Sequence, residues 1–97
     1  MYAVIFRAKI SGPDEQYGQI AHRMRKLALE KYGCIEFASV TEGDEEISIS
    51  YWQSQEHIKS WKNDAEHLAA QELGKSKWYG WYKVQIVEVV REYGSNT

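Results

Sequence analysis

The order of its hydrophobic patterns restricts this chain's fold more than any other feature of the sequence. Residues 2–10 read YAVIFRAKI, a run of strand-forming residues that ends at a turn and helix-start signal. Apolar residues then recur at helical spacing across 14–32. Two strand-like runs follow at 34–42 and 45–53, and Gly43-Asp44 between them predicts a hairpin.

The second half of the chain adds one more helical region and one more strand. Helical spacing resumes near Gln55 and ends at Gly74. It is interrupted at Asn63 and Asp64, either of which can cap a second helical piece. Residues 79–93 read as a long strand with apolar side chains on both faces, which predicts burial on both. The order βαββαβ predicts a ferredoxin-like α+β fold, a four-stranded antiparallel sheet with helices on one face.

The aromatic content of this chain predicts a partner or a cavity. Its 97 residues form one domain, and they include four Trp, seven Tyr and two Phe. A chain of this size buries only about 60 to 70% of its unfolded surface alone. Helices cover one face of the predicted sheet, so the apolar residues on the other face predict a homodimer that packs sheet on sheet.

Charge and composition argue against several classes of partner. A net charge of −2 gives no attraction to phosphate backbones, and the acidic run EEISISYWQ disfavours an RNA-recognition module of the same element order. The sequence has no membrane-spanning apolar run and no signal-peptide pattern at its start. Its single cysteine, Cys34, cannot form an internal disulfide, which fits a reducing compartment. We therefore expect a cytoplasmic protein with no nucleic-acid or membrane partner.

The segment SWKNDAEHLAAQELG, residues 60–74, carries the side chains best suited to chemistry. His67 titrates near neutral pH, so in an apolar cavity it can take a proton from a bound acidic hydroxyl. Gln71 follows one turn later, where it can hold a ligand oxygen. Trp61 offers a flat apolar wall and Asn63 a hydrogen-bond donor. The alternative is that His67 occupies the first turn of a helix and faces solvent, and spacing alone leaves both interpretations open.

Three further residues are candidates for ligand binding. Arg7 lies in the first strand and suits an anionic ligand, although pairing with Glu36 or Glu88 is the alternative. Trp52 and Tyr82 can line a pocket, or they can pack in the core or an interface. No two histidines have metal-ligand spacing and the lone cysteine adds no ligand, so we expect no metal site.

Three segments carry a family resemblance that covers nearly the whole chain. They are the opening MYAVIFRAKISG, the block SISYWQSQEHIKSWKNDAEHLAAQELGKSKWYGWY and the closing YKVQIVEVVREYG. The pattern resembles the antibiotic biosynthesis monooxygenase family, small dimeric α+β barrel proteins of ferredoxin-like fold. The resemblance implies one such domain over residues 1–97. The positions that match the family pattern are Trp52, Ser60-Trp61, His67, Ala70-Gln71 and Gly74.

The resemblance implies one chemistry more strongly than another. Cofactor-free oxygenation of polyphenols or quinols deprotonates a bound phenol, which then reacts with O2 in a dry cavity without metal or flavin. His67 would be the base, Asn63 an oxygen-holding donor, and Trp61 with Trp52 the walls. Heme-degrading members instead use a first-strand asparagine and a histidine ten residues after the tryptophan. This chain has Gln71 at that later position and no asparagine in its first strand, so heme cleavage is disfavoured.

The sequence therefore predicts a cofactor-independent monooxygenase-like homodimer that acts on a small aromatic or quinol-type substrate. A non-catalytic dimer that binds a small aromatic molecule remains the alternative. That protein would need the same pocket but no base, so replacing His67 would leave its function intact.

Overall fold

The structure, a computed structural model, describes residues 1–95 and follows the predicted order of elements with one addition. A π-helical turn, η1, links the last helix to the last strand. None of the helices within 1–95 is long and apolar enough to cross a membrane. The strands are β1 (Tyr2–Ile10), β2 (Glu36–Glu42), β3 (Glu45–Trp52) and β4 (Tyr79–Glu88). The helical elements are α1 (Glu15–Glu30), α2 (Gln55–Lys62), α3 (Ala65–Leu73) and η1 (Gly74–Trp78).

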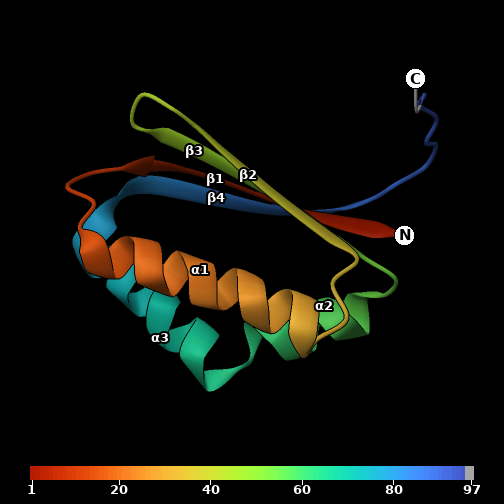
Figure 1. Ribbon diagram of the computed structural model, residues 1–97, viewed down its shortest axis with the longest axis horizontal. Helices are drawn as coiled ribbons and strands as arrows, with labels where there is room; N and C mark the ends of the chain where they lie inside the picture. Colours follow the sequence, from red (N-terminus) through yellow and green to blue (C-terminus); the bar gives the residue numbers. More distant parts are fainter. Residues whose placement is uncertain (96–97) are drawn as a thin grey trace.

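The four strands form one antiparallel sheet in the order β2-β3-β1-β4, and the helices lie on one of its faces (Figure 1). This is the ferredoxin-like α+β fold that the element order predicts. The last strand ends earlier than the predicted 79–93. Glu88 pairs with Tyr2 at the start of β1, and Val89 N donates to Met1 O at 2.9 Å, so the described chain offers no partner strand beyond that point.

Side-chain caps fix where the helices begin. Asp14 accepts a hydrogen bond from Tyr17 N at 2.9 Å, and α1 starts at the next residue. Of the two candidate caps for the later helical piece, Asp64 is the one used, since it accepts from Glu66 N at 2.8 Å. Asn63 instead ends α2. The interrupted helical pattern therefore forms two separate helices, and the Asp64 cap begins the second one, α3.

The register of the sheet gives β3 an inverted polarity. Ser48 and Ser50 pair with Phe6 and Val4 and share their helix-covered face, while Ile49 pairs with Ile5 on the open face. The polar side of β3 thus faces the helices and its apolar side faces away from them. This inversion leaves space and polar groups inside the molecule and apolar residues outside it.

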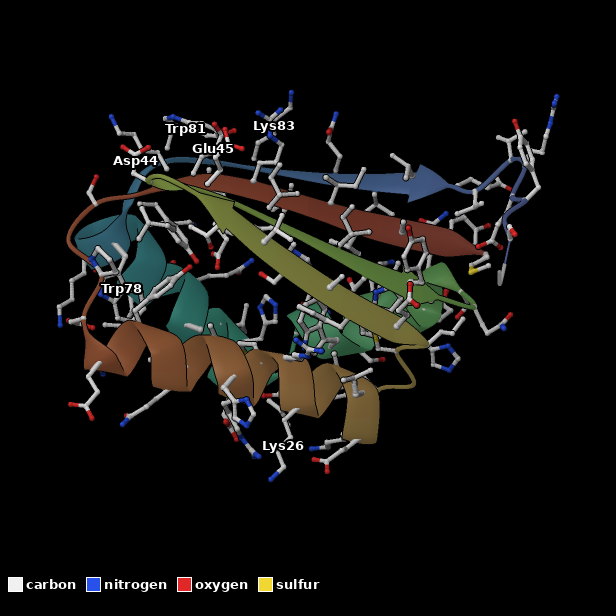
Figure 2. All side chains as sticks on the ribbon, turned by 45° about the horizontal axis from the view of Figure 1, so that its top comes forward. Lys26, Asp44, Glu45, Trp78, Trp81 and Lys83 are labelled. Carbon is white, nitrogen blue, oxygen red and sulfur yellow. The ribbon has the colours of Figure 1, made fainter. Side chains whose placement is uncertain are left out.

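The open face of the sheet is uncovered within one chain and carries apolar residues together with charged ones such as Arg7 and Glu45. Val40 on β2 is 67% exposed and Trp81 on β4 is 44% exposed, and Val87 is exposed toward the other end of β4. Figure 2 shows Trp81, Lys83 and Glu45 on the side turned away from the helices. The expectation that the last strand is buried on both faces is therefore not met by a single chain.

The main core gathers at one end of the helix layer. It comprises Val4, Leu27, Ala28, Cys34, Trp52, Ile58 and Trp61. Trp61 Nε1 donates to the carbonyl oxygen of Met24 at 3.1 Å, which ties α2 to α1. Because the core occupies the end where α1 finishes, the rest of the interlayer space is free for a cavity.

The π-helical turn that the sequence analysis missed depends on a glycine. Gly74 lies against the ring of Tyr79, and a Cβ at this position would come within 2.8 Å of ring carbon Cδ2 and closer still to Cε2. No side chain fits there without moving the tyrosine. The close approach sets the position of Tyr79 where the chain enters β4.

Replacing Gly74 by alanine should therefore lower the free energy of unfolding by about 1–3 kcal/mol, the usual cost of overpacking. Urea unfolding measures the change. Gly18→Ala is the matched control, because a Cβ at that position in α1 meets nothing within 4 Å. The control should raise stability by about 0.5–1 kcal/mol, since alanine favours a helix. Equal effects of the two substitutions would contradict the close approach.

Candidate functional site

A cavity of about 280 Å³ lies between the sheet, α1 and α3. A cavity of about 150 Å³ is enough to hold benzene, so this one has room for a fused-ring aromatic molecule. Its lining residues that are also exposed are Ala21, His22, Arg25, Ser39 and Tyr82, which mark its rim. Its apolar walls include Val4, Phe6, Ile20, Met24, Phe37, Trp61, Trp78, Tyr79 and Val84.

Four of the residues predicted from the sequence come together in this cavity. Trp61, His67, Gln71 and Tyr82 all line it. His67 is only 8% exposed, and its ring meets Trp61 edge-on at a centroid distance of 4.4 Å. His67 therefore faces the interior and not solvent, although it stands in the first turns of α3.

The structure does not bring Asn63, Trp52 and Arg7 to the cavity. Asn63 is exposed at the end of α2, where it lines a separate pocket. Trp52 is fully buried behind Trp61, at a ring-centroid distance of 5.2 Å. It supports the wall without forming it.

Arg7 lies on the opposite face of the sheet from the cavity. Its guanidinium pairs with Glu45 at 2.6 Å, and not with the suggested Glu36 or Glu88. The reason is register, since Arg7 aligns with Ile47, beside Glu45 on the same open face. The roles assigned to all seven predicted residues remain predictions.

The electrostatic state of His67 follows from its burial. Its Nδ1 atom has no hydrogen-bond partner among the described residues. Burial, assisted by the positive charge of Lys62, lowers the pKa of His67 to about 4. The imidazole is therefore neutral at pH 7, with a nitrogen free to bind a ligand.

Two charged residues that the sequence analysis did not single out also line the cavity. Lys62, the last residue of α2, is half-buried, and burial lowers its pKa. Glu46 lies at the other end, on β3, and accepts a hydrogen bond from the Tyr17 hydroxyl. Burial and then Glu46 raise the pKa of Tyr17, and the same causes raise that of Tyr79 to about 12.

The alternation of β3 is the sequence signal that could have found Glu46. Glu46, Ser48 and Ser50 occupy one face of that strand, opposite the isoleucines. The usual assumption turns such a polar face to solvent. Here the pairing of β3 with β1 turns it inward, and a sequence pattern alone does not fix that register.

The described residues lack both the ligand cluster of a metal site and a histidine at the position of the heme-degrading pattern. Among residues 1–95 no cluster of three His, Cys, Asp or Glu side chains could hold a metal ion. Gln71 occupies the position where the heme-degrading pattern needs histidine. His67 stands one turn earlier on the same wall.

Comparisons with known proteins agree with this architecture. A family model described as antibiotic biosynthesis monooxygenase matches residues 1–73. The chain is 42% identical over 92 residues to a Bacillus subtilis (strain 168) protein called "Uncharacterized protein YqjZ", covering 94% of this chain and 81% of that one.

Two solved structures share the fold at low sequence identity. A variant of SnoaB, a cofactor-independent oxygenase from Streptomyces nogalater, superposes with a TM-score of 0.81 at 8% identity, covering 97% of each chain. Rv0793 from Mycobacterium tuberculosis gives a TM-score of 0.80 at 14% identity, covering 96% of this chain and 98% of that one.

The buried histidine should make stability depend on pH. The pKa of His67 is lowered in the folded state, so the unfolded state binds the proton first as the pH falls. The stabilisation is complete above the unfolded value of about 6.5 and is lost progressively toward pH 4. Between about pH 7 and about pH 4.5 the loss should be about 2 kcal/mol.

Urea unfolding of wild type and His67→Gln at both pH values measures this contribution. The variant should lose correspondingly less stability on acidification, because the carboxylates with lowered pKa values are common to both proteins. Parallel pH profiles would show that His67 is not buried in a neutral form.

Proposed function

The chain belongs to the antibiotic biosynthesis monooxygenase family, and we propose that its cavity binds and oxygenates a small aromatic or quinol-type molecule without a metal or flavin. The observation that carries the proposal is a buried imidazole in an aromatic-walled cavity, whose Nδ1 atom has no hydrogen-bond partner among the described residues. Trp61 provides the wall on which a ring can stack, and Gln71 lies one turn from His67 on the same helix. Tyr82 closes the far side from β4.

The proposed reaction needs no electron source other than the substrate. A bound phenol loses its proton, and the phenolate passes one electron to O2. The ring radical and superoxide then combine at a ring carbon that carries hydrogen, and the peroxide takes up a proton. Loss of water leaves a carbonyl, so one oxygen atom enters the product quinone and the other leaves as water. The substrate loses two hydrogen atoms and gains one oxygen atom, a four-electron oxidation that matches the reduction of both atoms of O2.

The pKa of His67 limits its role in the first step. An unperturbed phenol has a pKa of about 10, about six units above that of the buried imidazole. Complete transfer of the proton in the empty site would cost about 8 kcal/mol. In this proposal His67 acts as a base only when another group stabilises the phenolate, and otherwise as a hydrogen-bond partner.

A non-catalytic ligand-binding protein is the second candidate. The position of Asn63 favours it, because the expected oxygen-holding donor lies outside the cavity. Such a protein would use the same walls formed by Trp61 and Tyr82. It would bind an aromatic molecule and consume no oxygen.

We also propose that two chains pair through the open sheet face. Ile5, Ile49 and Ala38 form a continuous apolar row across three strands there. Trp81 and Val40 add exposed apolar area at the flanks. Covering such a face with a second copy removes this area from water.

Oxygen uptake by metal- and flavin-free protein tests the oxygenase directly. Wild type should consume O2 with at least one member of a panel of hydroquinones and anthrols. His67→Ala should lose this activity by about 100-fold or more, the usual contribution of a positioned acid or base. Saturable binding of a panel member without uptake would instead support the ligand-binding protein.

Substitution of Ile49 by lysine tests the dimer. A lysine in the middle of the open face should convert a dimer to monomer in analytical ultracentrifugation. Leu68→Lys is the control, because Leu68 is exposed on α3, away from the sheet. A wild-type protein that sediments as a monomer would contradict the proposed pairing.

A further inference from the structure

Lys62 is a cation without an anion. It lines the cavity and is half-buried, whereas lysines are rarely buried unless paired. The ion pairs within residues 1–95 join Arg7, Lys9, Arg23, Lys31, Lys75 and Lys77 to carboxylates and leave Lys62 out. A charge removed from water in this way costs free energy that a bound counter-ion would recover.

His67 lines the same cavity as this cation, and its Nδ1 atom has no hydrogen-bond partner among the described residues. The charge of Lys62 contributes to the lowered pKa of His67, so the two groups lie close enough to interact. The positive charge of Lys62 disfavours the protonated imidazole, and burial disfavours the ammonium of Lys62. A negative oxygen placed between them would relieve both, because it attracts the ammonium and favours the imidazolium.

The other end of the cavity carries a negative charge where this end carries a positive one. The carboxylate of Glu46 accepts a hydrogen bond from the neutral hydroxyl of Tyr17 there, and Tyr79 lines the same end. Glu46 and Ser50 are separated by four positions on β3, which places them roughly 13 Å apart at about 3.3 Å per residue. Ser50 accepts a hydrogen bond from Trp52 Nε1 at 2.9 Å, which places it at the Trp61 end. The cavity therefore has a carboxylate at one end and a cation at the other.

We propose that Lys62 and His67 together bind an oxyanion of the ligand, a carboxylate or a phenolate, at the end of the cavity where α2 meets α3. The ligand's ring lies along Trp61, and any hydroxyl at its far end donates to Glu46. The inference deepens the proposed function, and it rests on that function only in taking the cavity as the ligand site. Lys62 then supplies the charge that a phenolate beside His67 requires.

Three naphthalene probes test the oxyanion site on the intact protein. They are naphthalene, 1-naphthoate and 1-naphthol, and tryptophan fluorescence quenching measures their binding. Wild type should bind 1-naphthoate or ionised 1-naphthol at least about tenfold more tightly than naphthalene, as expected of a hydrogen-bonded charged partner. The absorption spectrum of bound 1-naphthol reports whether it is ionised.

Two lysine variants test whether the preference for the anionic probe comes from Lys62. Lys62→Met should reduce the preference for the anionic probe to less than about twofold. Lys26→Met removes the same charge from the outer side of α1, where Figure 2 shows the side chain pointing away from the sheet, and should leave the preference intact. In wild type, NMR titration should show the pKa of His67 rising when the anionic probe binds, a readout that needs no substitution at Lys62.

The outcomes separate the two sources of the oxyanion and the two proposals. A preference for 1-naphthoate alone indicates a carboxylate site, and ionisation of bound 1-naphthol indicates a phenolate site; either supports the inference. Equal binding of naphthalene, an unchanged preference in Lys62→Met, or no binding of any probe overturns it. An oxyanion preference without oxygen uptake would refute oxygenation and leave the oxyanion site standing. Oxygen uptake that is unchanged in Lys62→Met would refute the oxyanion site and leave oxygenation standing.

Discussion

The pairing of β3 with β1 is the constraint on which the rest of the structure depends. It sets Ser48 opposite Phe6 inside the molecule and Ile49 opposite Ile5 on the open face. A shift of one residue would exchange the two faces. The observed register gives the interior a polar floor and leaves an apolar surface outside. The cavity and the proposed subunit contact are thus two consequences of one strand pairing.

Packing of aromatic rings holds the site in place above that floor. Trp52 is anchored to Ser50 by its indole nitrogen, Trp61 packs on Trp52, and His67 meets Trp61 edge-on. The hydrogen bond from Trp61 to Met24 adds α1 to this arrangement. Because each ring is fixed by a buried neighbour, the imidazole is positioned by the core and not by a mobile loop. This is the support that a binding or catalytic group requires.

Local signals predicted the elements well, but they did not show which side chains would meet. Helical spacing placed His67 and Gln71 on one side of a helix, and the Asp64 cap was one of two candidates. Asn63 lies outside the cavity because α2 ends at that residue. Lys62 and Glu46 were overlooked because charged residues normally face solvent, and only tertiary packing turns them inward. The π-helical turn depends on the contact of Gly74 with Tyr79, which no local propensity reveals.

An NMR search for contacts between the protein and bound 1-naphthol would show directly whether this cavity is where an aromatic molecule binds. Binding in the cavity should give nuclear Overhauser effects from the probe to the rings of Trp61 and His67, and none to Trp81 on the open face. Effects confined to Trp81, or absent from the cavity rings at saturating probe, would contradict the assignment of this cavity as the functional site.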